Sequence, residues 1–205
     1  MSNVNVRTAL FTASLACSMS IIAAAEREPS IPLQLREAGS FERIIVTTDR
    51  PVVLADLVGT ADLVVEGSVV AHRSYLDAGE AHIYTDYAFT ISDIMKNRRR
   101  PGLIKAGQSI LVRRESGTVL INGLRATTIE NGFPAFADNG RYVVFLRELG
   151  DLNAYSVLAG GRGAFEAGDQ IAPMMLAPAP GGAPAQPLPR QAFLGEMRAL
   201  LKFSE

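Results

Sequence analysis

The sequence predicts a mainly β protein: an OB-like antiparallel barrel of about five or six strands, with a short helix before the first long strand and a C-terminal helix. Three observations predict it. Residues 62–95 alternate between apolar and polar side chains in two long runs, shorter β-branched runs follow, and residues 190–203 repeat apolar side chains at helical spacing. Apolar residues make up 48% of the 205 residues, enough to fill the core of one domain.

The first 25 residues have the pattern of an export signal. Arg7 is their only charged residue, and an apolar stretch over 8–25 ends in three alanines before Glu26, a small-residue cleavage pattern. A retained membrane anchor and lipidation at Cys17 are the alternatives, but serines and threonines dilute the stretch and no basic cluster follows it. We therefore expect a periplasmic or secreted protein with no stable membrane span after signal removal.

Cysteine content and charge exclude several kinds of chemistry. Cys17 is the only cysteine, so removal of the signal leaves a mature chain without one. That excludes disulfides, a cysteine nucleophile, cysteine-ligated zinc and iron–sulfur clusters. The formal net charge of -1 offers no general attraction to nucleic acid, so we expect no nucleic-acid partner, and nothing in the sequence indicates a cofactor.

The remaining chain divides by its composition. Residues 26–40 contain two prolines and no clear period, which predicts an extended lead-in to a barrel domain over 41–174. Asp49 and Pro51 have the residue types of a helix start, and apolar side chains at helical spacing follow through Ala61; a loop that docks two leucines is the alternative.

The C-terminal part of the chain reads as a linker and a helix. Residues 175–189 form a Pro/Ala/Gly linker, and 190–205 an amphipathic helix. We expect that helix to fold back on the barrel; docking on a partner or on a membrane surface is the alternative.

The two long runs predict a β-hairpin whose register follows from its alternation. Odd-numbered positions are the apolar ones in both runs, so paired residue numbers should sum to an even number. A three-residue turn, Asp77-Ala78-Gly79, with Gly79 in the left-handed conformation, satisfies this rule. The predicted pairs are then Leu76 with Glu80, Ser74 with His82 and His72 with Tyr84, which directs both imidazoles away from the core.

The order of the motifs resembles a known family. A helix precedes "ADLVVEGSVV", a hairpin strand ends in "ISDIMKN", and "GFPAFADNGRYVVFLRE" and "YSVLAGGRGAFE" follow. This pattern of strands and turns, over about 53–171, resembles small exported bacterial proteins related to the tissue inhibitors of metalloproteases and to netrin modules. The resemblance implies an OB-type barrel. The family's inhibitors bind the target's zinc through an N-terminal cysteine, which the mature chain lacks, so that mechanism and its residues do not carry over.

Two sets of residues are candidates for a site. His72, His82 and Asp86 share the outer hairpin face in the predicted register, where they are candidate zinc or copper ligands; a solvated surface is the favoured alternative, because a closed site needs about four ligands. The basic residues, with one tyrosine, are candidates for binding an anionic envelope polymer or an envelope protein: Arg98, Arg99, Arg100, Arg113, Arg114 and Tyr84.

No set of catalytic roles can be assembled from the sequence. It contains no G-x-S-x-G motif, and an outer sheet face offers no oxyanion hole. We therefore expect a non-catalytic binding or interaction module. The alternative is a small metal-dependent or serine hydrolase that uses the His72, His82 and Asp86 face.

Overall fold

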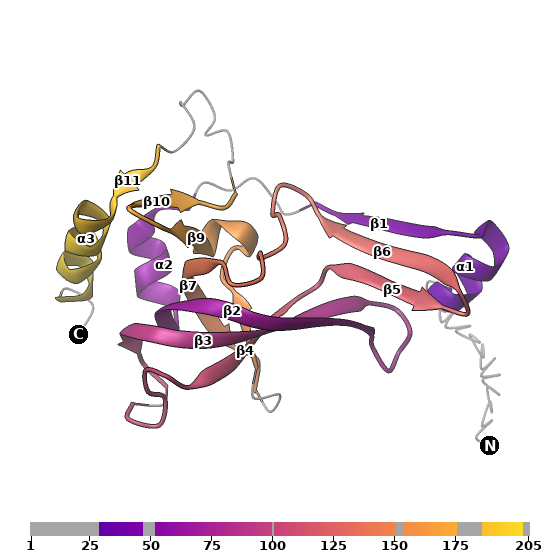
Figure 1. Cartoon of the computed structure of the whole chain (residues 1–205), viewed down its shortest axis with the longest axis horizontal. Helices are drawn as coiled ribbons and strands as arrows, with labels where there is room; N and C mark the ends of the chain where they lie inside the picture. Colours follow the sequence, from indigo (N-terminus) through magenta and orange to yellow (C-terminus); the bar gives the residue numbers. More distant parts are fainter. Residues whose placement is uncertain (1–28, 47–51, 100, 151–153, 176–185, 203–205) are drawn as a thin grey trace, which may run out of the picture.

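The computed structural model describes residues 29–46, 52–99, 101–150, 154–175 and 186–202 (Figure 1). The mainly β class is confirmed: the described residues form an eight-stranded and a three-stranded sheet, with three α-helices, so the strands outnumber the five or six expected. The predicted signal over 1–25, Cys17, Asp49, Pro51 and most of the predicted linker lie outside the described residues. None of the described helices is both long and apolar enough to cross a membrane.

The large sheet contains five strands that pair in a circuit. Its order is β11-β10-β9-β7-β2-β3-β4-β8, and β8 also pairs with β7, so that β7, β2, β3, β4 and β8 follow one another around a closed path. β4 and β8 run parallel, and the other pairs in the circuit are antiparallel. The strands are β2 (Leu63–Leu76), β3 (Ile83–Asn97), β4 (Ser109–Arg114), β7 (Arg141–Glu148), β8 (Ala154–Val157), β9 (Ala164–Ala167), β10 (Gln170–Pro173) and β11 (Leu188–Pro189).

The small sheet lies beside the tip of the β2–β3 hairpin (Figure 1). Its central strand β6 (Leu124–Glu130) pairs in parallel with β1 (Phe41–Ile45) and in antiparallel with β5 (Gly117–Ile121).

Helix α1 (Ile31–Ala38) precedes β1, where we expected an extended lead-in; that prediction is wrong for these residues. Pro32 fits the first helical turn, where no N–H partner is needed. Ile31 and Leu35, one turn apart, are buried against Ile83 and Ala126.

The first part of β2 is buried on both of its faces. Leu63 and Val65 face the interior of the strand circuit, with Phe89 among their neighbours. Val64 faces the opposite way, toward α2 (Leu54–Thr60) and α3 (Arg190–Lys202).

Both predicted helices are therefore present, and the C-terminal helix folds back on its own chain, as expected. Phe193 and Met197 of α3 are buried against Phe145 of β7 and Val58 of α2.

The hairpin register differs from the prediction. Leu76 pairs with Ile83 rather than Glu80, Tyr84 with Tyr75 rather than His72, and Ser74 with Thr85 rather than His82. The turn is longer than expected, because the Asp77 side chain accepts hydrogen bonds from the backbone N–H groups of Ala81 and His82. Glu80, and not Gly79, has the left-handed conformation, with φ of 55°.

Irregularities in the ladder compensate for this shift. The register changes between Val69 and Ala71, and Val69 then pairs with Phe89, so both strands again direct odd-numbered residues into the core. Nearer the tip, His72 pairs with Tyr87 and shares its face, whereas His82 lies beside Tyr84. Because side chains alternate along β3, the two histidines lie on opposite faces of the hairpin, and their predicted common face is wrong.

Candidate functional site

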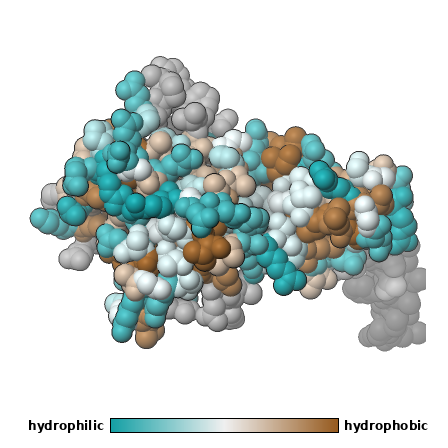
Figure 2. Space-filling model, in the orientation of Figure 1, coloured by the Kyte–Doolittle hydropathy of each residue, from teal (hydrophilic) through white to brown (hydrophobic). Residues whose placement is uncertain are grey.

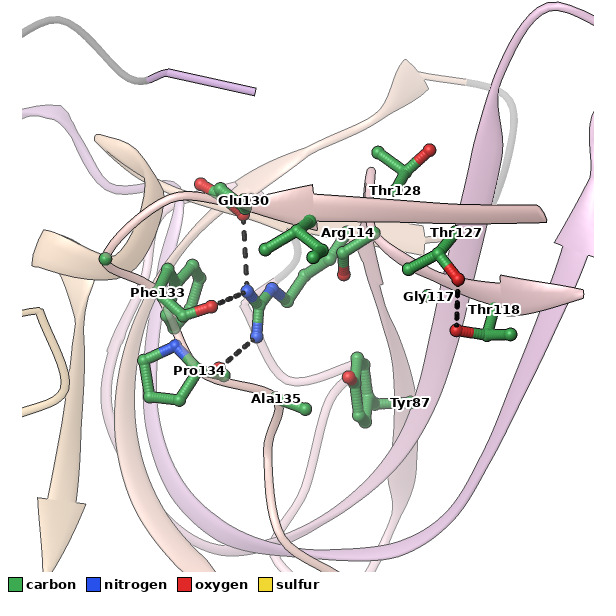
Figure 3. A pocket seen from close by; sticks show the side chains of 13 residues that line it. Tyr87, Arg114, Gly117, Thr118, Thr127, Thr128, Glu130, Phe133, Pro134 and Ala135 are labelled. Carbon is green, nitrogen blue, oxygen red and sulfur yellow. Dashed lines mark hydrogen bonds and ion pairs between the residues drawn. The ribbon is translucent and has the colours of Figure 1, made fainter. Parts of the chain in front are cut away.

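A pocket of about 500 Å³ lies where the small sheet meets β3 and β4 (Figure 3). Its walls come from Tyr87 of β3, from Arg114 and residues 116–118, from the last residues of β6 and from the loop 132–135. That volume is within the range of pockets that hold small molecules.

Arg114, the last residue of β4, forms one wall of the pocket, and 2% of its side chain is exposed. Nη1 donates to the Pro134 carbonyl oxygen at 2.6 Å, and Nη2 to the Phe133 carbonyl oxygen at 2.8 Å. Nη2 also meets a carboxylate oxygen of Glu130 at 3.3 Å. The guanidinium lies 3.3 Å from the centroid of the Phe133 ring. These contacts fix the group in one orientation (Figure 3).

Burial lowers the pKa of Arg114, and the nearby Glu130 carboxylate acts in the opposite direction. Arginine stays protonated in proteins even so, because its ordinary value is far above neutral pH. The Arg114–Glu130 pair thus gives this wall a cation and an anion at close range, with little net charge.

Two buried polar atoms of the pocket have no hydrogen-bond partner among the described residues: Nε of Arg114 and Oγ1 of Thr128. Thr128 is 2% exposed and lies on β6. A buried polar group without a partner costs about 1–3 kcal/mol. Both residues line the pocket, but these two atoms are covered by the protein itself, and Thr128 lies on the face of β6 that Ala126 also occupies.

Gly117 lets β5 begin beside the pocket. Its φ of +124° is unfavourable for other residues, and a Cβ there would collide with the hydroxyl groups of Ser74 and Thr85. Those hydroxyls bond to each other at 2.8 Å, and Thr85 Oγ1 donates to the Ser116 carbonyl oxygen at 2.6 Å. The chain can therefore turn from β4 into β5 directly after Arg114.

Arg113 and Tyr84 are brought together, on the face of β3 and β4 opposite to Arg114. Arg113 makes two hydrogen bonds to Asp86, at 2.7 and 2.8 Å, and lies over the rings of Tyr75 and Tyr84. Within this cluster the Arg113 guanidinium and the Asp86 carboxylate neutralise each other.

The other basic candidates lie elsewhere. Arg99 pairs with Asp62 at 3.0 Å at the far end of β3, next to Arg98. Arg100 is outside the described residues. The candidate basic residues that the structure describes, Arg98, Arg99, Arg113 and Arg114, are thus divided among three places and form no single patch.

The histidines take separate acidic partners. Nδ1 of His72 lies 2.9 Å from Asp138, and Nδ1 of His82 lies 2.6 Å from Glu115. Asp86, the third predicted ligand, is engaged by Arg113 instead. Within the described ranges, no three histidine, cysteine or acidic side chains are grouped as metal ligands.

Sequence reasoning named Arg114, but as part of a basic surface and not as a buried wall. It missed Thr128, Glu130 and Phe133. The only signal for this pocket was the alternation of "RR" along a strand, which places one of two adjacent arginines on each face.

No protein-family model matches the chain, and a search of curated proteins found no match to it.

Proposed function

We propose that this chain is an exported, non-catalytic binding module that holds a small molecule in the Arg114 pocket. The observation that carries the proposal is the pocket of about 500 Å³, in whose wall Phe133, Pro134 and Glu130 hold the Arg114 guanidinium in one orientation. The hydroxyl groups of Thr118 and Thr127, which also line the pocket, would bond to the polar group of the ligand. The export of the chain rests on its N-terminal sequence pattern alone.

An OB-like barrel is part of the proposal. The circuit β2-β3-β4-β8-β7 is a five-stranded path with one parallel pair, which supports that architecture. OB modules bind ligands across the face of their second and third strands. Here the second and third strands of the circuit are β3 and β4, which contribute Tyr87 and Arg114 to the pocket.

The pocket's side chains favour binding over chemistry. A guanidinium is a poor proton donor or acceptor at neutral pH, and Glu130 is already paired with it. Thr128 has no base among its described hydrogen-bond partners that would activate its hydroxyl as a nucleophile. An anionic polymer is a weaker alternative ligand, because Arg113 and Arg99 are engaged by Asp86 and Asp62.

The test is titration of the purified mature protein with methyl acetate, monitored by ¹H–¹⁵N NMR. We expect the backbone amide signals of residues that line the pocket, Thr118 and Thr127 among them, to shift. Thr127→Val should weaken the binding several-fold and change stability little, because it removes an exposed hydroxyl of the pocket wall.

Thr90→Val is the matched control, since the Thr90 hydroxyl is bonded to Ser109 on the surface and lies outside the pocket. It should leave the titration unchanged. No shift at the pocket residues, or equal binding by Thr127→Val, would overturn the proposal.

A further inference from the structure

The small sheet has one covered and one exposed face. Ala126 of β6 is buried in a cluster with helix α1 and the β2–β3 hairpin, and Val119 of β5 packs against the same cluster. Side chains alternate along each strand, so the neighbours of these residues point the other way. On that outer face Ile44 is 58% exposed, Ile129 43% and Leu120 71%. Figure 2 shows hydrophobic side chains on the part of the surface that this sheet forms.

One acid and one base lie on the same outer face as these aliphatic side chains. Glu42 on β1 and Arg125 on β6 are both exposed. Glu42 pairs with Thr127, two residues along β6 from Arg125, and Arg125 pairs with Leu120. With ordinary strand spacings the Cα atoms of Glu42 and Arg125 are then about 8 Å apart. A face with one charge of each sign can meet an identical face with opposite charges in contact.

A two-fold axis in the plane of the face shows that the aliphatic side chains fit the same arrangement. The axis lies midway between Glu42 and Arg125 and is perpendicular to the line that joins them, so it places each against the other residue of the second copy. With the same strand spacings it brings Ile44 and Ile129 to within about 4 Å, in the plane of the face, of Leu120 of the second copy. The strands of the two copies cross at roughly a right angle, which is one of the ways in which two sheets pack face to face.

Thr127 and Thr118 lie closest to this axis, where their small side chains allow the two sheets to approach. Both residues also line the Arg114 pocket, so a second copy and a ligand bonded to these hydroxyl groups exclude each other. Association is therefore measured without a ligand. The inference that follows does not rest on the proposed function.

We infer that the outer face of the small sheet binds a second copy of this chain as a symmetric dimer. Glu42 of each copy pairs with Arg125 of the other, and Ile44 and Ile129 of each copy cover Leu120 of the other. A face of three short strands is smaller than a standard interface of about 20–30 residues a side. We therefore expect a weak dimer, with a dissociation constant on the order of 10–100 µM.

Sedimentation velocity of the purified protein tests the inference, over concentrations from about 1 µM to about 1 mM. We expect a monomer at the lowest concentration and a dimer at the highest. Leu120→Ser should weaken the association about tenfold or more, because it removes the side chain that Ile44 and Ile129 cover. Leu103→Ser is the matched control, because Leu103 is equally exposed, at 72%, but lies in the β3–β4 loop.

Charge reversal tests the two-fold pairing itself. In a dimer of Glu42→Arg each charged contact joins two positive side chains, and in a dimer of Arg125→Glu it joins two negative ones. Each variant alone should associate about tenfold or more weakly than the wild type. In an equal mixture of the two variants both contacts join opposite charges again, so the mixture should recover the association. Glu37→Arg, at an exposed position of α1, is the control and should leave the association unchanged.

The outcomes separate this dimer from other forms of association. Loss of association in Leu120→Ser, together with its recovery in the mixture of the two charge variants, supports the inference. A wild-type protein that stays monomeric at the highest concentration overturns it. An unchanged affinity in Leu120→Ser, or a mixture that associates no better than its components, shows that the copies meet elsewhere and also overturns it. The proposed function is tested separately, by the methyl acetate titration, and stands or falls without the dimer.

Discussion

Arg190, the first residue of α3, holds both carboxylate oxygens of Glu66 on β2, at 2.8 and 2.5 Å, although 124 positions separate them in the sequence. Arg141 on β7 donates to the same carboxylate at 2.7 Å. Glu66 is 1% exposed, whereas the two arginine side chains reach solvent. A buried carboxylate between two guanidinium groups thus fixes the start of the C-terminal helix on the large sheet.

Replacing Arg190 should loosen this attachment. Arg190→Ala leaves Glu66 with Arg141 as its one charged partner among the described residues, and hydrogen bonds to charged groups contribute about 1.5–3 kcal/mol. Because Arg190 is partly exposed, we expect the free energy of unfolding in urea to fall by about 1–2 kcal/mol. Arg198→Ala, at an exposed position of the same helix, should change it by less than about 0.5 kcal/mol. Equal losses in the two variants would contradict this account.

The same carboxylate should make stability depend on acid. Burial raises the pKa of Glu66, but the hydrogen bonds and charges of Arg190 and Arg141 outweigh burial and hold that pKa below the ordinary value of 4.5. The unfolded chain then binds a proton more readily. The contribution of Glu66 is therefore fully present above about pH 4.5 and is lost as the pH falls through the folded-state pKa.

Urea unfolding of the wild type and of Glu66→Gln at neutral and acid pH measures this contribution. The difference in unfolding free energy between the two proteins should shrink toward acid pH. Asp62 and Asp77 also have lowered pKa values, but they act in both proteins and cancel in the difference. A difference that stays constant with pH would show that Glu66 contributes nothing through its charge.

The docking of α3 depends on Phe193, which is 2% exposed and packs against Phe165. Phe193→Ala should lower the unfolding free energy by about 3 kcal/mol or more, because it leaves a cavity between the helix and the sheet. Leu188→Ala, just before the helix at a largely exposed position, should have a small effect. Thermal unfolding followed by circular dichroism compares the two; similar midpoints would mean that α3 is not held by this ring.

Alternation along the chain predicted the long strands and the core positions Val69, Phe89 and Ile91, because it reports which face of a strand is apolar. It could not predict the register at the tip. A side-chain cap by Asp77 lengthens the turn, and an irregularity beside Val70 restores the apolar face further along, so the sequence pattern is the same with either register.

The candidate site was less predictable, for a physical reason. The choice between Arg113 and Arg114 as the buried residue depends on the loop that contains Phe133 and on β6, both of which come later in the chain. The residues around Thr128 and Glu130 in the sequence are those of an ordinary strand, so they do not indicate a pocket. Helix α1 was missed because eight residues with two buried side chains are too few to show a helical period.

Two glycines of similar appearance in the sequence should respond to alanine in opposite ways. A Cβ at Gly67 would collide with the Thr90 carbonyl oxygen and the Phe89 ring, beside a register shift in β2. Because the Thr90 oxygen belongs to the backbone of the paired strand, Gly67→Ala should lower the unfolding free energy by about 1–3 kcal/mol.

At Gly59, in α2, an added Cβ meets nothing within 4 Å. Gly59→Ala should raise the unfolding free energy by up to about 1 kcal/mol, because alanine favours the helix and restricts the unfolded chain. Urea unfolding of both variants checks the signs, and a stabilised Gly67→Ala protein would mean that β2 and β3 do not approach each other as closely as described.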